Sequence, residues 1–141
     1  MRRPLRVGGV AYKPLAVYGT LMSGQPFEDV WLGLGTAEPC TIPGLRLVVY
    51  PSHTQFPYGM KFQNDTAVGE LIWIEPPHYL DLLARLDRLE GVPHHYQRIS
   101  HIVRTEEHLN WEAWLYAIEP RQMRRGIKIP NNDWRQFVAN N

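Results

Sequence analysis

The strongest constraint on the fold is the stretch AVGELIWIE, residues 67–75, in which apolar side chains occupy both odd and even positions. Successive side chains of a β-strand point to opposite faces of the sheet, so this pattern predicts a strand that is covered on both faces. Glu70 is the exception, because it places a charge on one of those faces. We therefore expect a sheet with packed layers on both sides of this strand.

A helix is predicted directly after this strand, from residue 76 to residue 90. Pro76 and Pro77 suit a first helical turn, and Gly91 with Pro93 ends the pattern. The apolar stripe, spaced i, i+3, i+4 and i+7, consists of Tyr79, Leu82, Leu83 and Leu86. One heptad beyond Leu83 the stripe reaches Glu90, so a carboxyl group occupies a position where the pattern calls for a leucine.

The other predicted elements are shorter. Apolar or alternating runs predict strands over residues 15–18, 33–41 and 45–50, and an antiparallel hairpin of residues 96–104 and 111–118. Short helices are predicted over residues 26–32 and 134–138, the second capped by Asp133 or Asn132. Residues 51–60 contain two prolines and are predicted to be a loop without regular structure.

Size and composition indicate one globular domain. A length of 141 residues suffices for one core, and a net charge of +1 gives no field that attracts nucleic acid or an acidic membrane. The single cysteine, Cys40, cannot form an internal disulfide, and no apolar run is long enough to span a membrane. The N-terminus lacks the apolar segment of a signal peptide. We expect an extension over residues 1–12, a domain over residues 13–141 and a cytoplasmic location.

The stretch KPLAVYGTLMSGQP, residues 13–26, is the first candidate for a binding site. Its apolar run ends at Tyr18, and Gly19 has no Cβ, so a ligand can approach the main chain closely there. The amides of Gly19, Thr20 and Leu21 are turned away from strand partners and can donate hydrogen bonds to a carboxylate or an oxyanion. The alternative is an ordinary turn from a strand into a loop.

Glu90 is the second candidate. Its place on the apolar side of the helix and at the helix C-terminus disfavours the charged form, so its carboxyl pKa is expected to rise toward values useful in proton transfer. Alternatively, the helix frays before Glu90 and the carboxylate is solvated or pairs with Arg88 or Arg98. Asp87 is expected to pair with a basic residue.

The sequence gives less support to metal binding, nucleophilic catalysis or nucleic-acid binding. The histidines lack a metal-binding spacing, and Cys40 lies in a predicted strand rather than in a nucleophile motif, so we expect neither a metal or other cofactor nor a covalent intermediate. The basic run over residues 121–128 lacks interleaved aromatic residues, so we expect a solvated surface and no nucleic-acid partner.

Five motifs, in their order and spacing, resemble the gamma-glutamylcyclotransferase-like family, also called AIG2-like or BtrG-like. The motifs are VYGTLMSG (17–24), GEL (69–71), LDRLEG (86–91), Tyr96 with Arg98, and DWR (133–135). The resemblance covers residues 13–137. It implies an α+β fold: a single domain with a small, mixed, barrel-like β-sheet and flanking helices.

The resemblance also implies an activity, the cyclisation of a gamma-glutamyl amide to 5-oxoproline with release of an amine. Residues Tyr18, Gly19, Thr20 and Leu21 match the family's substrate-anchoring loop, and Glu90 matches its acid/base glutamate. Tyr96 is expected to line the pocket, together with Phe56 and Tyr58.

The sequence departs from the family pattern at two places. Many members carry a basic residue where this chain has Met22-Ser23, and Asn132 stands where a glycine is usual before DWR. The first departure, with the aromatic residues of the segment 51–60, leaves the identity of the leaving amine open. The alternative function is a non-catalytic module that binds a small metabolite on the same fold.

Overall fold

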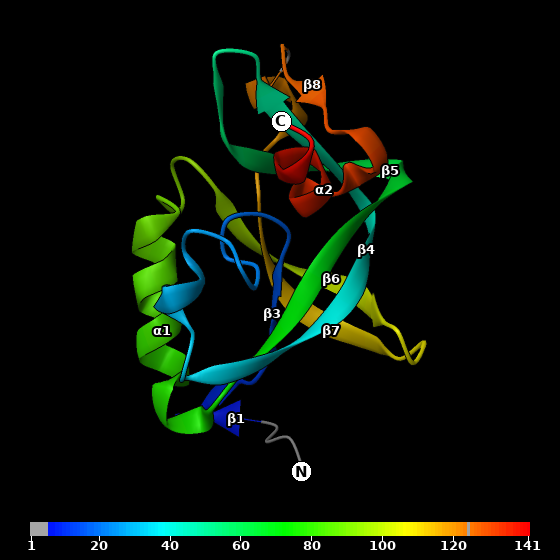
Figure 1. Cartoon of the computed structure of the whole chain (residues 1–141). Helices are drawn as coiled ribbons and strands as arrows, with labels where there is room; N and C mark the ends of the chain where they lie inside the picture. Colours follow the sequence, from blue (N-terminus) through cyan, green and yellow to red (C-terminus); the bar gives the residue numbers. More distant parts are fainter. Residues whose placement is uncertain (1–5, 124) are drawn as a thin grey trace.

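The computed structural model describes residues 6–123 and 125–141, and a closed barrel of β-strands forms its centre (Figure 1). The barrel strands are β3 (Leu15–Val17), β4 (Gly35–Tyr50), β5 (His53–Ile74), β6 (Gln97–Thr105) and β7 (Asn110–Ala117). They are ordered β5-β3-β7-β6-β4, and β4 pairs with β5 to close the ring. Because β3 and β7 are parallel and the other barrel pairs are antiparallel, the sheet is mixed. The predicted α+β fold with a barrel-like sheet is confirmed.

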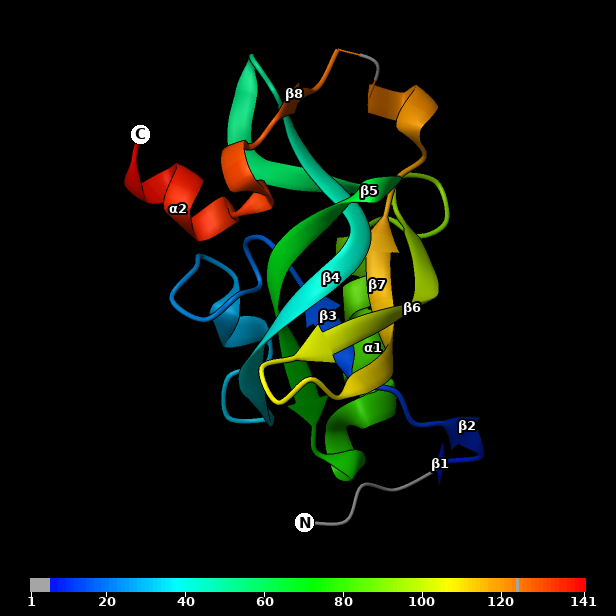
Figure 2. The same ribbon diagram turned by 90° about the vertical axis from the view of Figure 1, so that its right-hand side faces the viewer.

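The remaining elements surround this barrel (Figure 2). Helix α1 (Pro76–Leu89) follows β5, and a small hairpin of β1 (Arg6–Val7) and β2 (Val10–Ala11) lies near it. The C-terminal part contains the 3-10 turns η2 (Pro120–Met123) and η3 (Pro130–Asn132), strand β8 (Ile127–Lys128), which pairs with β4, and helix α2 (Trp134–Ala139). Residues 1–5 of the expected extension lie outside the described residues, and the boundary at residue 13 stays a prediction.

The two faces of β5 belong to separate cores, as the apolar pattern of residues 67–75 predicts. Ile72 and Ile74 pack in a core with helix α1, whereas Leu71 and Trp73 pack in a second core on the face turned away from the helix. The helix contributes its entire predicted stripe to the first core: Tyr79, Leu82, Leu83 and Leu86. Because its side chains alternate between two faces, β5 contacts the helix layer on one face and the barrel interior on the other.

Three local predictions are corrected. The strands predicted over residues 33–41 and 45–50 form the single strand β4, interrupted by a bulge at Gly44, whose φ of 77° suits glycine. The helix predicted over residues 26–32 is only the 3-10 turn η1 (Glu28–Val30). The predicted loop over residues 51–60 is a turn at 51–52 followed by the start of β5. Pro57 fits into this strand because the β4–β5 register shifts between Val48 and Tyr50, opposite this part of β5.

Asn132 anchors the C-terminal segment to the barrel. Its Oδ1 accepts a hydrogen bond from the Leu47 amide at 3.0 Å, and its Nδ2 donates to Asp65 at 3.3 Å and to the Thr66 carbonyl at 3.4 Å. The residue is buried and has a φ of 49°, in the left-handed region. Asparagine and glycine both tolerate this conformation, so the asparagine fits a position where the family that the sequence resembles usually has a glycine.

We expect Asn132→Ala to lower the free energy of unfolding by about 2 kcal/mol, since it leaves the buried Leu47 amide unpaired and places an alanine in the left-handed region. Asn132→Gly is the matched control, because it removes the same hydrogen bonds without the backbone strain. Denaturant unfolding measures both variants, and equal stability of Asn132→Ala and the native chain contradicts the assignment.

Candidate active site

A cavity of about 250 Å³ lies beside the end of α1 and the segment that follows β3. Its volume is close to the lower end of the range, roughly 300–1,000 Å³, typical of small-molecule sites. Its wall consists of residues 16–21, Phe27, Phe56, Pro57, Leu89, Glu90, His95, Tyr96 and Tyr116. Segments far apart in the sequence therefore meet at one site.

The loop of residues 18–27, hereafter the 18–27 loop, forms one wall of this cavity, and contacts from other parts of the chain hold it. Trp31 Nε1 donates to the Leu21 carbonyl at 2.6 Å, and the Ser23 amide donates to Glu70 Oε1 at 2.6 Å. Glu70 is buried, and its other oxygen lies 3.8 Å from Arg135 Nη1. The unusual charge in the strand pattern thus binds the 18–27 loop on one side and the DWR motif on the other.

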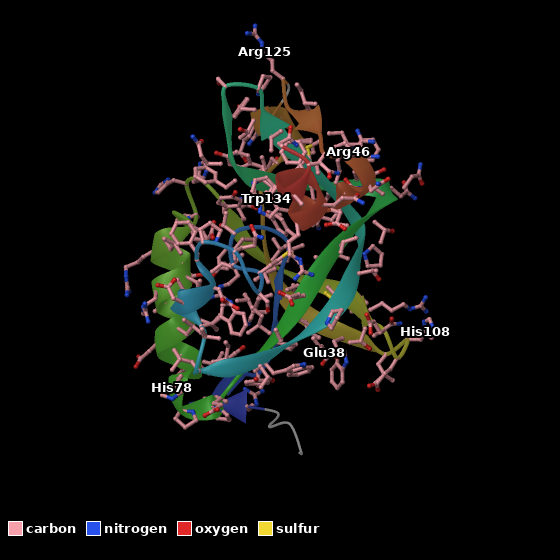
Figure 3. All side chains as sticks on the ribbon, viewed as in Figure 1. Glu38, Arg46, His78, His108, Arg125 and Trp134 are labelled. Atoms are coloured by element: carbon pink, nitrogen blue, oxygen red, sulfur yellow. The ribbon has the colours of Figure 1, made fainter. Side chains whose placement is uncertain are left out.

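The C-terminal segment makes a second contact with the same loop. Trp134 Nε1 donates to Gln25 Oε1 at 3.1 Å, and the Trp134 side chain is buried in the second core. Figure 3 shows Trp134 near α2, above the barrel strands. Helix α2 begins after Asp133, whose carboxylate accepts from the Gln136 amide, as one of the two predicted caps would do. The DWR motif therefore caps a helix and supports the 18–27 loop.

Gly19 is required by packing rather than by its dihedral angles. A Cβ at this position would lie 2.6 Å from Pro57 Cγ, so any larger residue would push the 18–27 loop away from β5. The amides of Gly19, Thr20 and Leu21 donate to no acceptor within residues 6–123 and 125–141. All three residues line the cavity, so their unpaired N–H groups are candidate donors to an oxygen atom of a ligand.

Glu90 is held at the end of α1 by a Schellman motif. The Gly91 amide donates to the Arg88 carbonyl and the Val92 amide to the Asp87 carbonyl, with Gly91 at a φ of 69°. Glu90 is thus the C-cap residue of an ordered helix end, and its own carbonyl accepts from the Tyr96 amide. This geometry excludes the alternative in which the helix frays before Glu90.

Burial raises the pKa of the Glu90 carboxyl group from 4.5 to about 7. The carboxyl group lines the cavity and makes no hydrogen bond or ion pair within the described residues. Arg98, one alternative partner, instead binds Asp87 with Nε–Oδ1 and Nη2–Oδ2 distances of 2.8 and 3.2 Å. Near neutral pH, Glu90 can therefore both accept and donate a proton.

We expect this pKa to make stability depend on pH. Glu90 ionises near pH 4.5 in the unfolded chain and near pH 7 in the folded chain. Its ionisation therefore does not lower the free energy of unfolding below pH 4.5, and lowers it progressively as the pH rises from 4.5 to 7. Glu90→Gln lacks this penalty. We expect it to be more stable than the native chain at pH 8 by about 3 kcal/mol and nearly equal to it at pH 4.5, as measured by denaturant unfolding. A stability difference that does not change with pH contradicts this origin.

Three tyrosines on the cavity wall have their hydroxyl groups bound inside the protein. Tyr18 donates to the Tyr116 carbonyl at 2.6 Å, Tyr96 to the Pro57 carbonyl at 3.1 Å, and Tyr116 to Asp87 Oδ1 at 2.7 Å. Burial is the main cause that raises the pKa of all three phenols, so they stay neutral. Of the three phenols and the Glu90 carboxyl group, only Glu90 is therefore suited to carry a proton at neutral pH.

All six candidate residues from the sequence lie on the wall of this one cavity: Tyr18, Gly19, Thr20, Leu21, Glu90 and Tyr96. Phe56 also lines it, whereas Tyr58 lies behind the wall and stacks on Tyr96 with ring centroids 5.6 Å apart. The sequence reasoning missed Tyr116, which no pattern distinguishes from a core residue of β7. It also missed Leu89. This residue is apolar, lies outside the buried stripe of the helix and is next to Glu90, and these features could have identified it as a lining residue.

The histidines are spread over the molecule. His78 lies at one end of α1 and His108 at the turn between β6 and β7 (Figure 3). In the described part of the chain, no group of three or more His, Cys, Asp and Glu side chains is arranged to hold a metal ion. None of the described helices has the length and apolar character needed to cross a membrane.

Comparisons with known proteins identify a family and several solved structures that share this fold. The family model described as gamma-glutamyl cyclotransferase, AIG2-like, matches residues 15–136. An AIG2-like protein from Mus musculus is 26% identical with a TM-score of 0.59, over 76% of this chain and 78% of that one. An uncharacterised protein from Pyrococcus horikoshii shares the fold at 21% identity with a TM-score of 0.66, over 92% of this chain and 95% of that one.

A search of the curated proteins finds no match. A uropathogenic E. coli-specific protein, 15% identical with a TM-score of 0.63, has the same fold over 92% of this chain and 97% of its own. The family model spans the barrel, α1 and the start of α2, and therefore every segment that lines the cavity. The chain belongs to the gamma-glutamyl cyclotransferase, AIG2-like family.

Proposed function

We propose that this protein cleaves a gamma-glutamyl amide by intramolecular cyclisation and releases 5-oxoproline and an amine. The observation that carries the proposal is Glu90, a carboxyl group with a pKa of about 7 on the wall of a cavity that the 18–27 loop also lines. The family match and the AIG2-like mouse protein agree with this class of reaction.

The chemistry needs one proton carrier. Glu90 as carboxylate takes a proton from the substrate's α-ammonium group, and the freed amine nitrogen attacks the γ-carbonyl carbon. The new C–N bond closes the five-membered ring. The bond from that carbon to the leaving nitrogen then breaks as protonated Glu90 returns its proton to that nitrogen. The second proton of the ring nitrogen passes through Glu90 to the released amine, which leaves as an ammonium ion. No water is consumed, and Glu90 ends in the form in which it began.

The amides of the 18–27 loop supply the second requirement. The free N–H groups of Gly19, Thr20 and Leu21 bind either the substrate's α-carboxylate or the oxyanion that develops on the γ-carbonyl oxygen. Binding of the carboxylate bends the glutamyl chain so that its amine faces its own carbonyl.

A protein nucleophile is not needed, because the substrate supplies its own. The only cysteine, Cys40, is buried, and burial is the main cause that raises the pKa of its thiol to about 12. A thiol of this kind does not ionise at neutral pH and cannot serve as a nucleophile.

Mass-spectrometric detection of 5-oxoproline tests the proposal directly. The purified chain is incubated with a panel of gamma-glutamyl dipeptides and gamma-glutamyl amides, and Glu90→Gln serves as the control. We expect 5-oxoproline and one equivalent of free amine from the native chain alone. If no member of the panel is cleaved but several raise the melting temperature, the protein is instead a module that binds a small metabolite on this fold.

A further inference from the structure

We propose that the amine released from the substrate is apolar and uncharged apart from its reacting nitrogen: an aryl-alkyl or alkyl amine without a carboxylate. This inference rests on the proposed function, since it concerns the leaving group of the same reaction. Two independent features carry it, the side chains at the mouth of the cavity and the small number of polar groups left for a ligand.

The mouth of the cavity is a ring of exposed apolar side chains. Phe27, Phe56 and Leu89 are 40%, 42% and 51% exposed although all three line the cavity. They come from the 18–27 loop, from β5 and from the end of α1, so the fold brings three distant segments to one opening. Apolar side chains gathered in this way at a concave site favour an apolar ligand group.

The deeper part of the cavity holds the groups that suit the glutamyl half. Glu90 can bind the α-ammonium group, and the free amides of residues 19–21 can bind the α-carboxylate. With the glutamyl half held by these groups, the amine half lies toward the exposed side chains of the wall, Phe27, Phe56 and Leu89.

No lysine or arginine among the described residues lines the cavity. The hydroxyl groups of Tyr18, Tyr96 and Tyr116 already donate to acceptors inside the protein. A carboxylate on the leaving amine would therefore lose water without gaining a cation or a free hydroxyl donor, which is unfavourable. A leaving group such as an amino acid or a dipeptide carries that carboxylate, whereas a simple amine does not.

His95 also lines the cavity. Its ring packs edge-on against Tyr96 and Tyr58, with centroid distances of 4.9 and 5.5 Å. The His95 ring is therefore part of the aromatic surface on this side of the cavity.

Three matched substrates test the inference at pH 8. Gamma-L-glutamyl-phenethylamide and gamma-L-glutamyl-L-phenylalanine share the aromatic ring and differ by one carboxylate, and gamma-L-glutamyl-ethylamide lacks the ring. We expect kcat/KM for the phenethylamide to exceed both others by about tenfold or more. Equal or faster turnover of the phenylalanine compound overturns the inference while the proposed reaction stands.

Binding to Glu90→Gln separates the inference from the reaction. Calorimetry on this variant measures affinity without chemistry, and we expect the same order of ligands. If the three compounds bind in this order of affinity but the native chain turns over none of them, the apolar mouth is supported and the proposed reaction is overturned. If none of the three compounds binds or reacts while another member of the gamma-glutamyl panel is cleaved, the inference is overturned and the proposed reaction stands.

Substitutions at the mouth link the preference to these residues. The double variant Phe27→Ser, Leu89→Ser changes two exposed side chains, so we expect it to fold, and we expect the ratio of kcat/KM between phenethylamide and ethylamide to fall toward one. Ile102→Ala is the matched control, since Ile102 is 51% exposed on β6 and does not line the cavity. An unchanged ratio in the double variant contradicts the inference.

Discussion

Replacing Glu90 with glutamine is expected to lower kcat for 5-oxoproline release by a factor of about 10²–10⁴, the usual contribution of a positioned acid or base. Glutamine has nearly the same shape, so the cavity and the Schellman motif at the end of α1 are retained. The amide can neither accept the proton of the α-ammonium group nor return it to the leaving nitrogen. We also expect native kcat/KM to change with an apparent pKa near 7, because Glu90 has a pKa of about 7.

Glu75→Gln is the control for this substitution. Glu75 is exposed at the opposite end of the same helix, where it precedes α1, and it does not line the cavity. Its replacement removes the same charge from the same helix and is expected to leave kcat within twofold of the native value. If Glu90→Gln retains native turnover while folded, the proton is carried by another group.

Gly69→Ala is expected to destabilise the fold by about 3 kcal/mol and to lower the melting temperature by about 9 °C. A Cβ on Gly69 would lie 2.5 Å from the Val17 carbonyl oxygen and 2.8 Å from Ile42 Cδ1. The oxygen belongs to the backbone of β3, so the clash can be relieved only by separating β3 from β5. These strands are neighbours in the closed barrel, and Val17 also lines the cavity.

Gly33→Ala separates this steric effect from the general cost of losing a glycine. A Cβ on Gly33 meets no atom within 4 Å, but its φ of 85° is unfavourable for alanine, so we expect a loss of about 1 kcal/mol. Thermal and denaturant unfolding measure both variants. Equal losses in the two variants would show that close contact between β3 and β5 is not what Gly69 provides.

Elements defined by local periodicity were predictable from the sequence. The strand pattern of residues 67–75 and the stripe of α1 each reflect burial on known faces, and both are found with the expected side chains in the cores. Glu90 was recognisable for the same reason, because a carboxyl group interrupts an otherwise apolar stripe. The pairing of Asp87 with a basic residue, Arg98, was also expected from the sequence.

Features that depend on distant pairing were not predictable. Residues 51–60 contain Pro57 and appeared unsuited to a strand, yet pairing with the long strand β4 tolerates the proline at an irregular point of the register. The partners of Glu70, Ser23 and Arg135, come from opposite ends of the chain and share no local pattern with it. The mouth of the cavity joins Phe27, which lies in a turn before η1, to side chains of β5 and α1.

The contacts of the 18–27 loop also make its order depend on a distant part of the chain. Trp134 and Gln25, which share a hydrogen bond, are 109 positions apart. All five barrel strands end by Ala117, so a nascent chain that has reached residue 129 contains the complete barrel but neither Trp134 nor Arg135. Pairing of the barrel strands therefore does not require these two anchors of the 18–27 loop. The cavity wall that this loop forms depends on the C-terminal segment, so a change in that segment can loosen the site while the barrel persists.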